Sequence, residues 1–335
     1  MHTSPGVVSL TELPIHPDTA QIYRLEPKDP NPLYYAERTD RNIPWITEAE
    51  QYALLDKVVG IAGCGGMGAA IAQIFLRLGV GEIRIADPEV FEVSNINRQF
   101  AARRDTVGQS KAFATAHMLR AISDDTTIVV YPQGLTEHTV ESFVDGCDLI
   151  IDEIEFWNVG SCIVLHQAAR TQGIPIVNGL TVGFASYLHL FEPESMAVET
   201  MLGFSRKEAL ALEHHFVNRT ASQSKRDRVM QAVLAVFVPD LPQYFTGPGS
   251  MERNAFVLRR LQEEGKAPIL ATNPPLAAGL VADRALLRLL ADDSRSALRS
   301  VATLPAAPGY VVIDALRFTI TIVPTRSVVV GTKYA

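Results

Sequence analysis

"VVGIAGCGGMGAAIAQIFLRLG", residues 58–79, decides the fold class of this 335-residue chain. An apolar stretch typical of a buried strand comes first, then a glycine-rich turn, then an apolar run of helical length that stops at a glycine. Strand, glycine turn and helix in this order begin a nucleotide-binding βαβ fold. The backbone N–H groups of Gly63, Gly65, Gly66 and Gly68, with the helix N-terminus, can hold phosphate oxygens of NAD, FAD or ATP alike.

Strands and helices alternate after this stretch. Strands are expected at residues 82–87, 126–133, 147–154 and 174–179, with helices at 111–123, 138–146 and 162–173. This alternation predicts an α/β fold: a Rossmann-like, mostly parallel, doubly wound sheet with helices on both faces. Residues 185–193 alternate in polarity, which predicts a strand added antiparallel at the edge. Residues 273–290 should be helical, and residues 310–323 one long strand or a hairpin, which places antiparallel strands in the C-terminal half.

Three segments are expected from changes in composition. Residues 1–37 are proline-rich and predict an extension that wraps a surface or a partner. Residues 38–335 form one domain around the sheet. Within it, residues 205–265 are helical and charged, and predict a cap inserted over the sheet, where substrate would be recognised.

Composition excludes several classes of function. The net charge of −7, without a long block of like charge, makes nucleic acid an unlikely partner. Three irregularly spaced cysteines supply neither a CxxC pair nor a disulfide framework, so we expect no structural zinc and a reduced, cytoplasmic location. The N-terminus lacks the basic start and the apolar core that are typical of a signal peptide, so we expect none. The uncharged run at residues 58–76 contains the glycines and fits a soluble strand, loop and helix better than a membrane span.

Four side chains after the second strand bear on which nucleotide binds. Asp87 lies about 20 residues beyond the glycine turn, where a carboxylate can accept hydrogen bonds from ribose hydroxyls. Asn95, Arg98 and Lys111 follow, on the side where the carboxyl ends of the strands open. A triphosphate presents more charge than a dinucleotide and needs such cations. An NAD-dependent oxidoreductase explains the glycines and Asp87 but leaves the other three without a role, and it stays an alternative.

"GCGGMG", "ADPEVFEVSNINRQF" and "VGQSK" together resemble the adenylation core of the E1-like family, which includes ubiquitin-activating enzymes and the ThiF and MoeB activators of sulfur-carrier proteins. The resemblance implies a magnesium-requiring, ATP-dependent adenylyltransferase acting on a carboxylate, either a small protein or peptide C-terminus or a small molecule. It implies that Asp87 binds ribose and that Ser94 to Arg98 and Lys111 hold the phosphates of ATP. It also implies a homodimer in which Arg41, or with less support Arg38, reaches the partner's phosphates.

The chain departs from the family pattern at two points. Glu155 and Phe156 stand where the family has an Asp-Asn pair, and Glu155 still offers a carboxylate to Mg²⁺, with Glu153 in reserve because strand alternation points both the same way. No cysteine follows Cys162, so no thioester step is expected within this chain. These departures leave a third reading open, a non-catalytic E1-like binding subunit.

Overall fold

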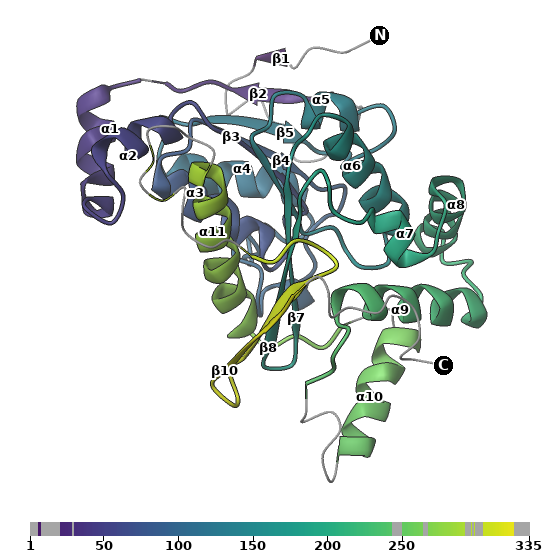
Figure 1. Cartoon of the computed structure of the whole chain (residues 1–335). Helices are drawn as coiled ribbons and strands as arrows, with labels where there is room; N and C mark the ends of the chain where they lie inside the picture. The colour runs from purple at the N-terminus through teal and green to yellow at the C-terminus, as the bar shows by residue number, and fades with distance from the viewer. Residues whose placement is uncertain are drawn as a thin grey trace.

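The computed structural model describes residues 6–7, 21–28, 30–242, 250–263, 267–291, 296, 298 and 304–324. Its core is a ten-stranded sheet with strand order β1-β2-β5-β4-β3-β6-β7-β8-β9-β10 (Figure 1). The strands are β1 Gly6–Val7, β2 Tyr23–Leu25, β3 Val58–Ala62, β4 Glu82–Ala86, β5 Thr127–Tyr131, β6 Leu149–Asp152, β7 Ile176–Val182, β8 Ala185–Phe191, β9 Tyr310–Asp314 and β10 Thr319–Val323.

The centre of the sheet is parallel, as the alternation of strands and helices predicts. β5, β4, β3, β6 and β7 run parallel, and their residues are almost entirely buried because helices cover both faces. β8 joins β7 antiparallel, and residues 310–323 form a hairpin of β9 and β10 that extends the same edge. The predicted mixed α/β sheet is therefore confirmed.

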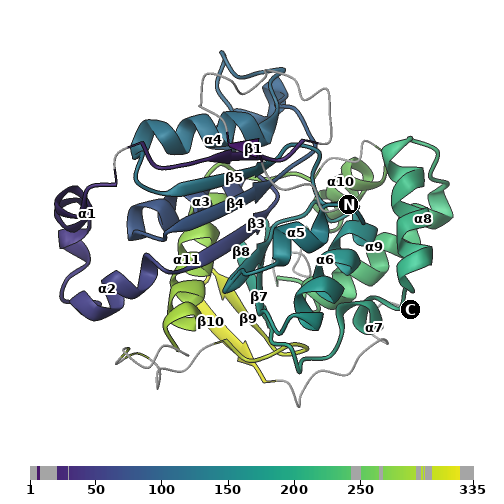
Figure 2. The same ribbon diagram turned by 90° about the horizontal axis from the view of Figure 1, so that it is seen from above.

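The helices form two layers around the sheet (Figure 2). α3, α4 and α11 pack on one face and share one apolar core with it, whereas α5, α6, α7 and α9 share a second core on the other face. The helices are α1 Pro32–Thr39, α2 Glu48–Leu54, α3 Gly68–Leu78, α4 Lys111–Ile122, α5 Val140–Val144, α6 Val159–Thr171, α7 Val198–Leu202, α8 Arg206–Val217, α9 Gln223–Phe237, α10 Ser250–Glu263 and α11 Asn273–Ala291, with short 3₁₀ turns at η2 Asp40–Asn42 and η3 Val93–Asn95.

Part of the expected N-terminal extension belongs to the sheet. β2 pairs antiparallel with β5, and β1 pairs parallel with β2. α1 begins after Asn31, whose side chain accepts backbone N–H groups of the first turn, and Pro32 occupies the first helical position. The boundary expected between residues 37 and 38 thus falls inside a helix.

The expected cap corresponds to α8, α9 and α10. α8 packs on α6 and α9 packs on α7, so this segment forms an outer helical layer on one side of the sheet (Figure 2). Within the described part of the chain, no helix has the length and apolar character needed to cross a membrane.

Candidate functional site: a nucleotide crevice at the carboxyl edge of the sheet

The glycine-rich turn connects β3 to α3 at the carboxyl edge of the sheet, and two of its glycines are required by packing. Gly63 has φ +102°, and a Cβ there would lie 2.2 Å from the Glu153 carbonyl oxygen. A Cβ on Gly68 would lie 1.9 Å from the Gly63 carbonyl oxygen. These two glycines let the strand, the turn and the helix pack closely.

The other two glycines face a more open space. A Cβ on Gly65 would meet only Gln99 Nε2, 3.8 Å away, and one on Gly66 would meet Pro274 at 3.3 Å and the Arg98 stem at 3.7 Å. Packing alone therefore does not explain why position 65 has no side chain. A backbone that must approach a phosphate does explain it.

Asp87 follows β4 and contacts the turn directly. Its carboxylate oxygens accept hydrogen bonds from the backbone N–H groups of Cys64 (2.7 Å) and Glu89 (2.8 Å). Burial raises the pKa of Asp87, while Lys111 opposes this rise. Each oxygen retains a lone pair that can accept a further hydrogen bond.

Lys111 begins α4 and is buried beside carboxylates. Its Nζ donates to Glu89 Oε2 at 2.5 Å. Burial alone would lower the pKa of Lys111, but Asp87, Glu89 and Glu155 more than offset that effect and raise it. The ammonium group therefore stays charged in the crevice.

The segment "SNINRQF" places one cation and two buried polar side chains beside the turn. Arg98 donates to the Ser94 carbonyl oxygen and to Asn97 Oδ1, and burial lowers the pKa of its guanidinium, which Glu155 partly opposes. Asn95 is buried and accepts the backbone N–H of Glu92, so its side chain shapes this segment.

Gln99 is a residue that the sequence did not single out. It is buried, and its Oε1 has no hydrogen-bond partner among the described residues. Its Nε2 lies next to Gly65. An unpaired amide oxygen at the glycine turn marks Gln99 as a further candidate ligand contact.

Glu155 and Glu153 have different surroundings, although strand alternation predicted one orientation for both. β6 ends at Asp152, so the alternation does not extend to either residue. Glu155 has an exposed side chain, yet the protein around it restricts its hydration and raises its pKa; Glu89 adds to the rise, and Lys111 and Arg98 oppose it.

Glu153 lies toward β7 instead. A Cβ on Gly179 would meet its Oε1 at 3.3 Å, and that oxygen is buried without a hydrogen-bond partner in the described structure. Burial raises the pKa of Glu153 well above its usual range. Glu155, not Glu153, therefore belongs to the group of charges around Lys111.

Arg41 lies in η2, away from these charges. It is exposed and forms no hydrogen bond or ion pair with any described residue. Arg38, the weaker candidate, is held within the chain by Asp125 (2.6 Å) and the Leu76 carbonyl oxygen (2.9 Å). Arg41 alone of the two is therefore free to reach another molecule.

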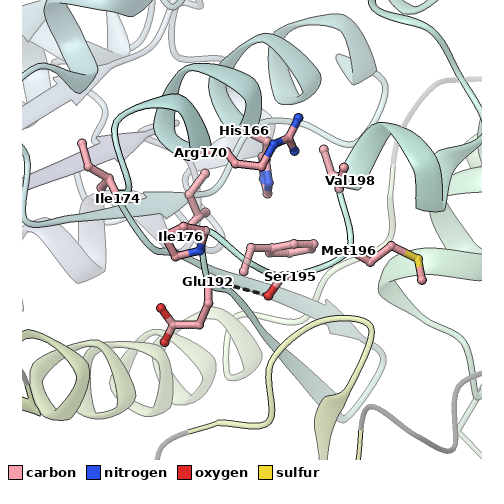
Figure 3. A pocket seen from close by; sticks show the side chains of 11 residues that line it. His166, Arg170, Ile174, Ile176, Glu192, Ser195, Met196 and Val198 are labelled. Carbon is pink, nitrogen blue, oxygen red and sulfur yellow. Dashed lines mark hydrogen bonds between the residues drawn. The ribbon is translucent and has the colours of Figure 1, made fainter.

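A second hollow lies at the opposite edge of the sheet (Figure 3). His166 and Arg170 of α6, Ile176 at the start of β7 and Phe191 at the end of β8 line it. Because β7 begins here, this hollow is separate from the crevice at the glycine turn.

The sequence matches the ThiF family over residues 39–327. The chain belongs to the ThiF family. The N-terminal boundary of this match is one residue away from the expected start of the main domain, at residue 38.

Curated relatives match a shorter stretch of the chain. The SAMP-activating enzyme E1 of Haloferax volcanii is 31% identical over 144 residues, 43% of this chain and 53% of that protein. The sulfur carrier protein ThiS adenylyltransferase of Bacillus subtilis is 31% identical over 125 residues, 37% of each chain. The matched region thus spans about half of these relatives or less.

Two solved structures share the fold over most of the chain. PaaA superposes with a TM-score of 0.59 at 15% identity, covering 89% of this chain and 76% of that one. E. coli MccB with ATP gives 0.58 at 16% identity, covering 90% and 74%. At sequence identities this low, the structural likeness shows the fold alone.

Proposed function

We propose that this ThiF-family protein adenylates a substrate carboxylate with ATP. The observation that carries the proposal is the meeting of the open glycine turn, Asp87, Lys111, Arg98 and Glu155 at one edge of the sheet. The substrate carboxylate attacks the α-phosphorus, the bond to the bridging oxygen breaks, and pyrophosphate leaves. An acyl-adenylate remains, ready for a nucleophile.

The chain's own groups position ATP and neutralise its charge. Asp87 accepts the ribose hydroxyls, and the N–H groups at the turn and the α3 N-terminus hold phosphate oxygens. Lys111 and Arg98 stabilise the charge that develops on the departing pyrophosphate. Ser94 and Asn95 shape the segment that carries Arg98.

Glu155 is proposed to hold Mg²⁺. Hard cations prefer oxygen ligands, and the Glu155 carboxylate lies among charges that include Glu89, Lys111 and Arg98. When bound, Mg²⁺ supplies Lewis-acid stabilisation of the phosphate oxygens. The raised pKa of Glu155 predicts that metal affinity falls on acidification sooner than for an ordinary glutamate.

No cysteine of the chain is suited to receive the acyl group. Cys64, Cys147 and Cys162 are all buried, and burial raises the pKa of each thiol. Thiolate is the reactive form, so these residues are poor nucleophiles. We propose that the acyl-adenylate passes directly to an amine, a sulfur donor or a nucleophile of the substrate itself.

The acceptor of AMP is proposed to be a small protein or peptide C-terminus, or a small-molecule acid. The names of the relatives point to sulfur carriers, and MccB has been solved with the peptide MccA. We further propose a homodimer in the cytoplasm, with Arg41 of one protomer at the phosphates of the other and the helices of residues 205–265 near the substrate.

Calorimetric titration with ATP and Mg²⁺, and separately with NAD, tests this proposal. We expect ATP to bind, NAD not to bind, and Arg98→Ala and Lys111→Ala each to weaken ATP binding by roughly tenfold or more, since each removes a charge-assisted contact. Arg103→Ala is the matched control, because the Arg103 side chain, as far as the described residues show, pairs with exposed Asp105 in the same connecting segment.

Three other results would count against the proposal. If the protein bound NAD and did not bind ATP, an NAD-dependent oxidoreductase would be the better hypothesis. Equal loss in the Arg103 control would show that the segment, not the charge at Arg98, matters. ATP binding without pyrophosphate release across a panel of carrier-protein and peptide C-termini would favour the non-catalytic subunit.

A further inference from the structure

Three metal-ligating side chains meet in the core between β6 and α6. Asp152 ends β6, and Cys162 and His166 lie four residues apart on α6, so both face the strand. All three are buried, and one donor atom from each lies within 4.8 Å of the others. They take no part in the proposed chemistry at the glycine turn.

Their hydrogen bonds converge on a single oxygen. His166 Nε2 lies 2.9 Å from Asp152 Oδ2, and Cys162 Sγ lies 3.4 Å from the same oxygen. Donor atoms around a tetrahedral zinc ion lie about 3.3–3.8 Å apart, given bond lengths of about 2.0–2.3 Å. These two separations need to open by only a few tenths of an ångström to match such a site, and all three donors lie within 4.8 Å of one another.

The surroundings fix the orientation of the donors. The Ile154 backbone N–H donates to Asp152 Oδ1 at 3.1 Å, and Phe191 packs edge-on against the His166 ring at 4.6 Å between centroids. Asn178 Nδ2 donates to the Asp152 carbonyl oxygen. Such outer contacts orient the ligands of metal sites.

We propose that Asp152, Cys162 and His166 form a structural site for a thiophilic divalent ion such as Zn²⁺. Carboxylate, thiolate and neutral imidazole give the bound ion a net charge of zero, which suits a buried position. On binding, the S–H bond of Cys162 breaks, a Zn–S bond forms, and the proton passes to solvent. A water molecule would complete a tetrahedral coordination.

The site would clamp the carboxyl end of β6 to α6. Glu155 lies three residues beyond Asp152, so the clamp would fix the strand end from which the magnesium-binding segment starts. The sequence expectation of no structural zinc rested on the lack of CxxC pairs. These ligands instead come from the end of a strand and from the helix that follows it, and a search for CxxC pairs does not detect such a set.

Metal content of the full-length protein tests the proposal without reference to any activity. The protein is produced with zinc in the medium, dialysed and analysed by elemental mass spectrometry. We expect stoichiometric zinc in the wild type, loss of it in Cys162→Ser, and retention in Cys147→Ser, whose buried thiol instead donates to the Phe143 carbonyl oxygen. Serine can still donate to Asp152, so Cys162→Ser should fold.

Cobalt provides a second measurement on the wild type alone. Co²⁺ added to the metal-free protein should produce a thiolate-to-metal charge-transfer absorption, and zinc should raise the unfolding temperature. A folded wild type without zinc and without the cobalt absorption would overturn the site. Equal zinc in Cys162→Ser and Cys147→Ser would also overturn it, because the metal would then lie elsewhere.

Discussion

At the scale of single residues, His189 illustrates how burial sets a charge state. It lies in β8 among Phe191, Phe237 and Tyr310, fully buried, with Nε2 donating to the Phe237 carbonyl oxygen. Burial lowers its pKa to about 4. In the unfolded chain the imidazole titrates near pH 6.5, so the unfolded state binds more protons between these values and stability falls as the pH drops.

We expect the burial of His189 to lower the free energy of unfolding by about 3 kcal/mol near pH 4 relative to neutral pH. Urea unfolding of the wild type and of His189→Phe between pH 7.5 and pH 4.5 measures this pH dependence. The carboxylates contribute alike to the stability of both proteins, so the difference between the two profiles belongs to His189. The stability of the wild type should fall more steeply than that of the variant. Parallel pH profiles would disprove the assignment, and exposed His138→Phe should keep the wild-type profile.

The residues of the crevice divide into those that sequence could predict and those that it could not. Asp87 directly follows β4 and Lys111 is the first residue of α4, and such element ends lie close together at the carboxyl edge of a parallel sheet. Gln99 lies in an irregular segment with no periodicity to indicate burial. The contact of Asp152 with His166 depends on how α6 packs on β6, and the sequence pattern of each element alone does not predict that packing.

At the scale of elements, two glycines in the turn between β3 and α3 have different roles. Gly68 is needed for close packing, whereas Gly65 is proposed to leave room for phosphate. Gly68→Ala would press Cβ against the Gly63 carbonyl oxygen, so we expect a loss of roughly 2–4 kcal/mol of stability. Gly65→Ala meets only Gln99 Nε2 and should change stability by less than about 0.5 kcal/mol. It should nevertheless weaken ATP binding about tenfold, because the methyl group occupies the phosphate space.

Chemical unfolding and ATP titration of both variants check this separation. Gly279→Ala serves as control, because no atom lies within 4 Å of its Cβ in α11; alanine there should stabilise the helix by about 0.5–1 kcal/mol. Unchanged ATP affinity in Gly65→Ala would mean that the phosphates lie elsewhere.

At the scale of the whole molecule, sequence predicts the parallel centre of the sheet better than its edges. Most residues of the five central strands are apolar, and these strands alternate with helices along the chain, a pattern that is local. β2 has only three residues, and its pairing with β5 depends on a contact between residues about a hundred positions apart. Such a short strand near the edge of the sheet is defined by the partner with which it pairs rather than by its own sequence.

The proposed homodimer gives a test that involves the whole molecule. Arg41 and Trp45 lie exposed on the segment between α1 and α2, and 86% of Trp45 is solvent-accessible. A large exposed aromatic side chain near in sequence to a cation that pairs with no described residue suits an interface between protomers. We expect Trp45→Asp to shift the protein to monomers in sedimentation, whereas Val217→Asp on exposed α8 should leave the dimer intact.

Mixed dimers then test whether Arg41 acts across the interface. Arg41→Ala and Lys111→Ala homodimers should each bind ATP weakly, since each site lacks one cation. In an equimolar mixed population, about half of the dimers are heterodimers, and in each of these one site regains both residues, so about a quarter of all sites should recover wild-type affinity. If Arg41 instead served its own protomer, every site in a heterodimer would still lack one cation. Calorimetric titration after co-expression would then show no high-affinity sites, and the shared-site proposal would fail even if the protein sediments as a dimer.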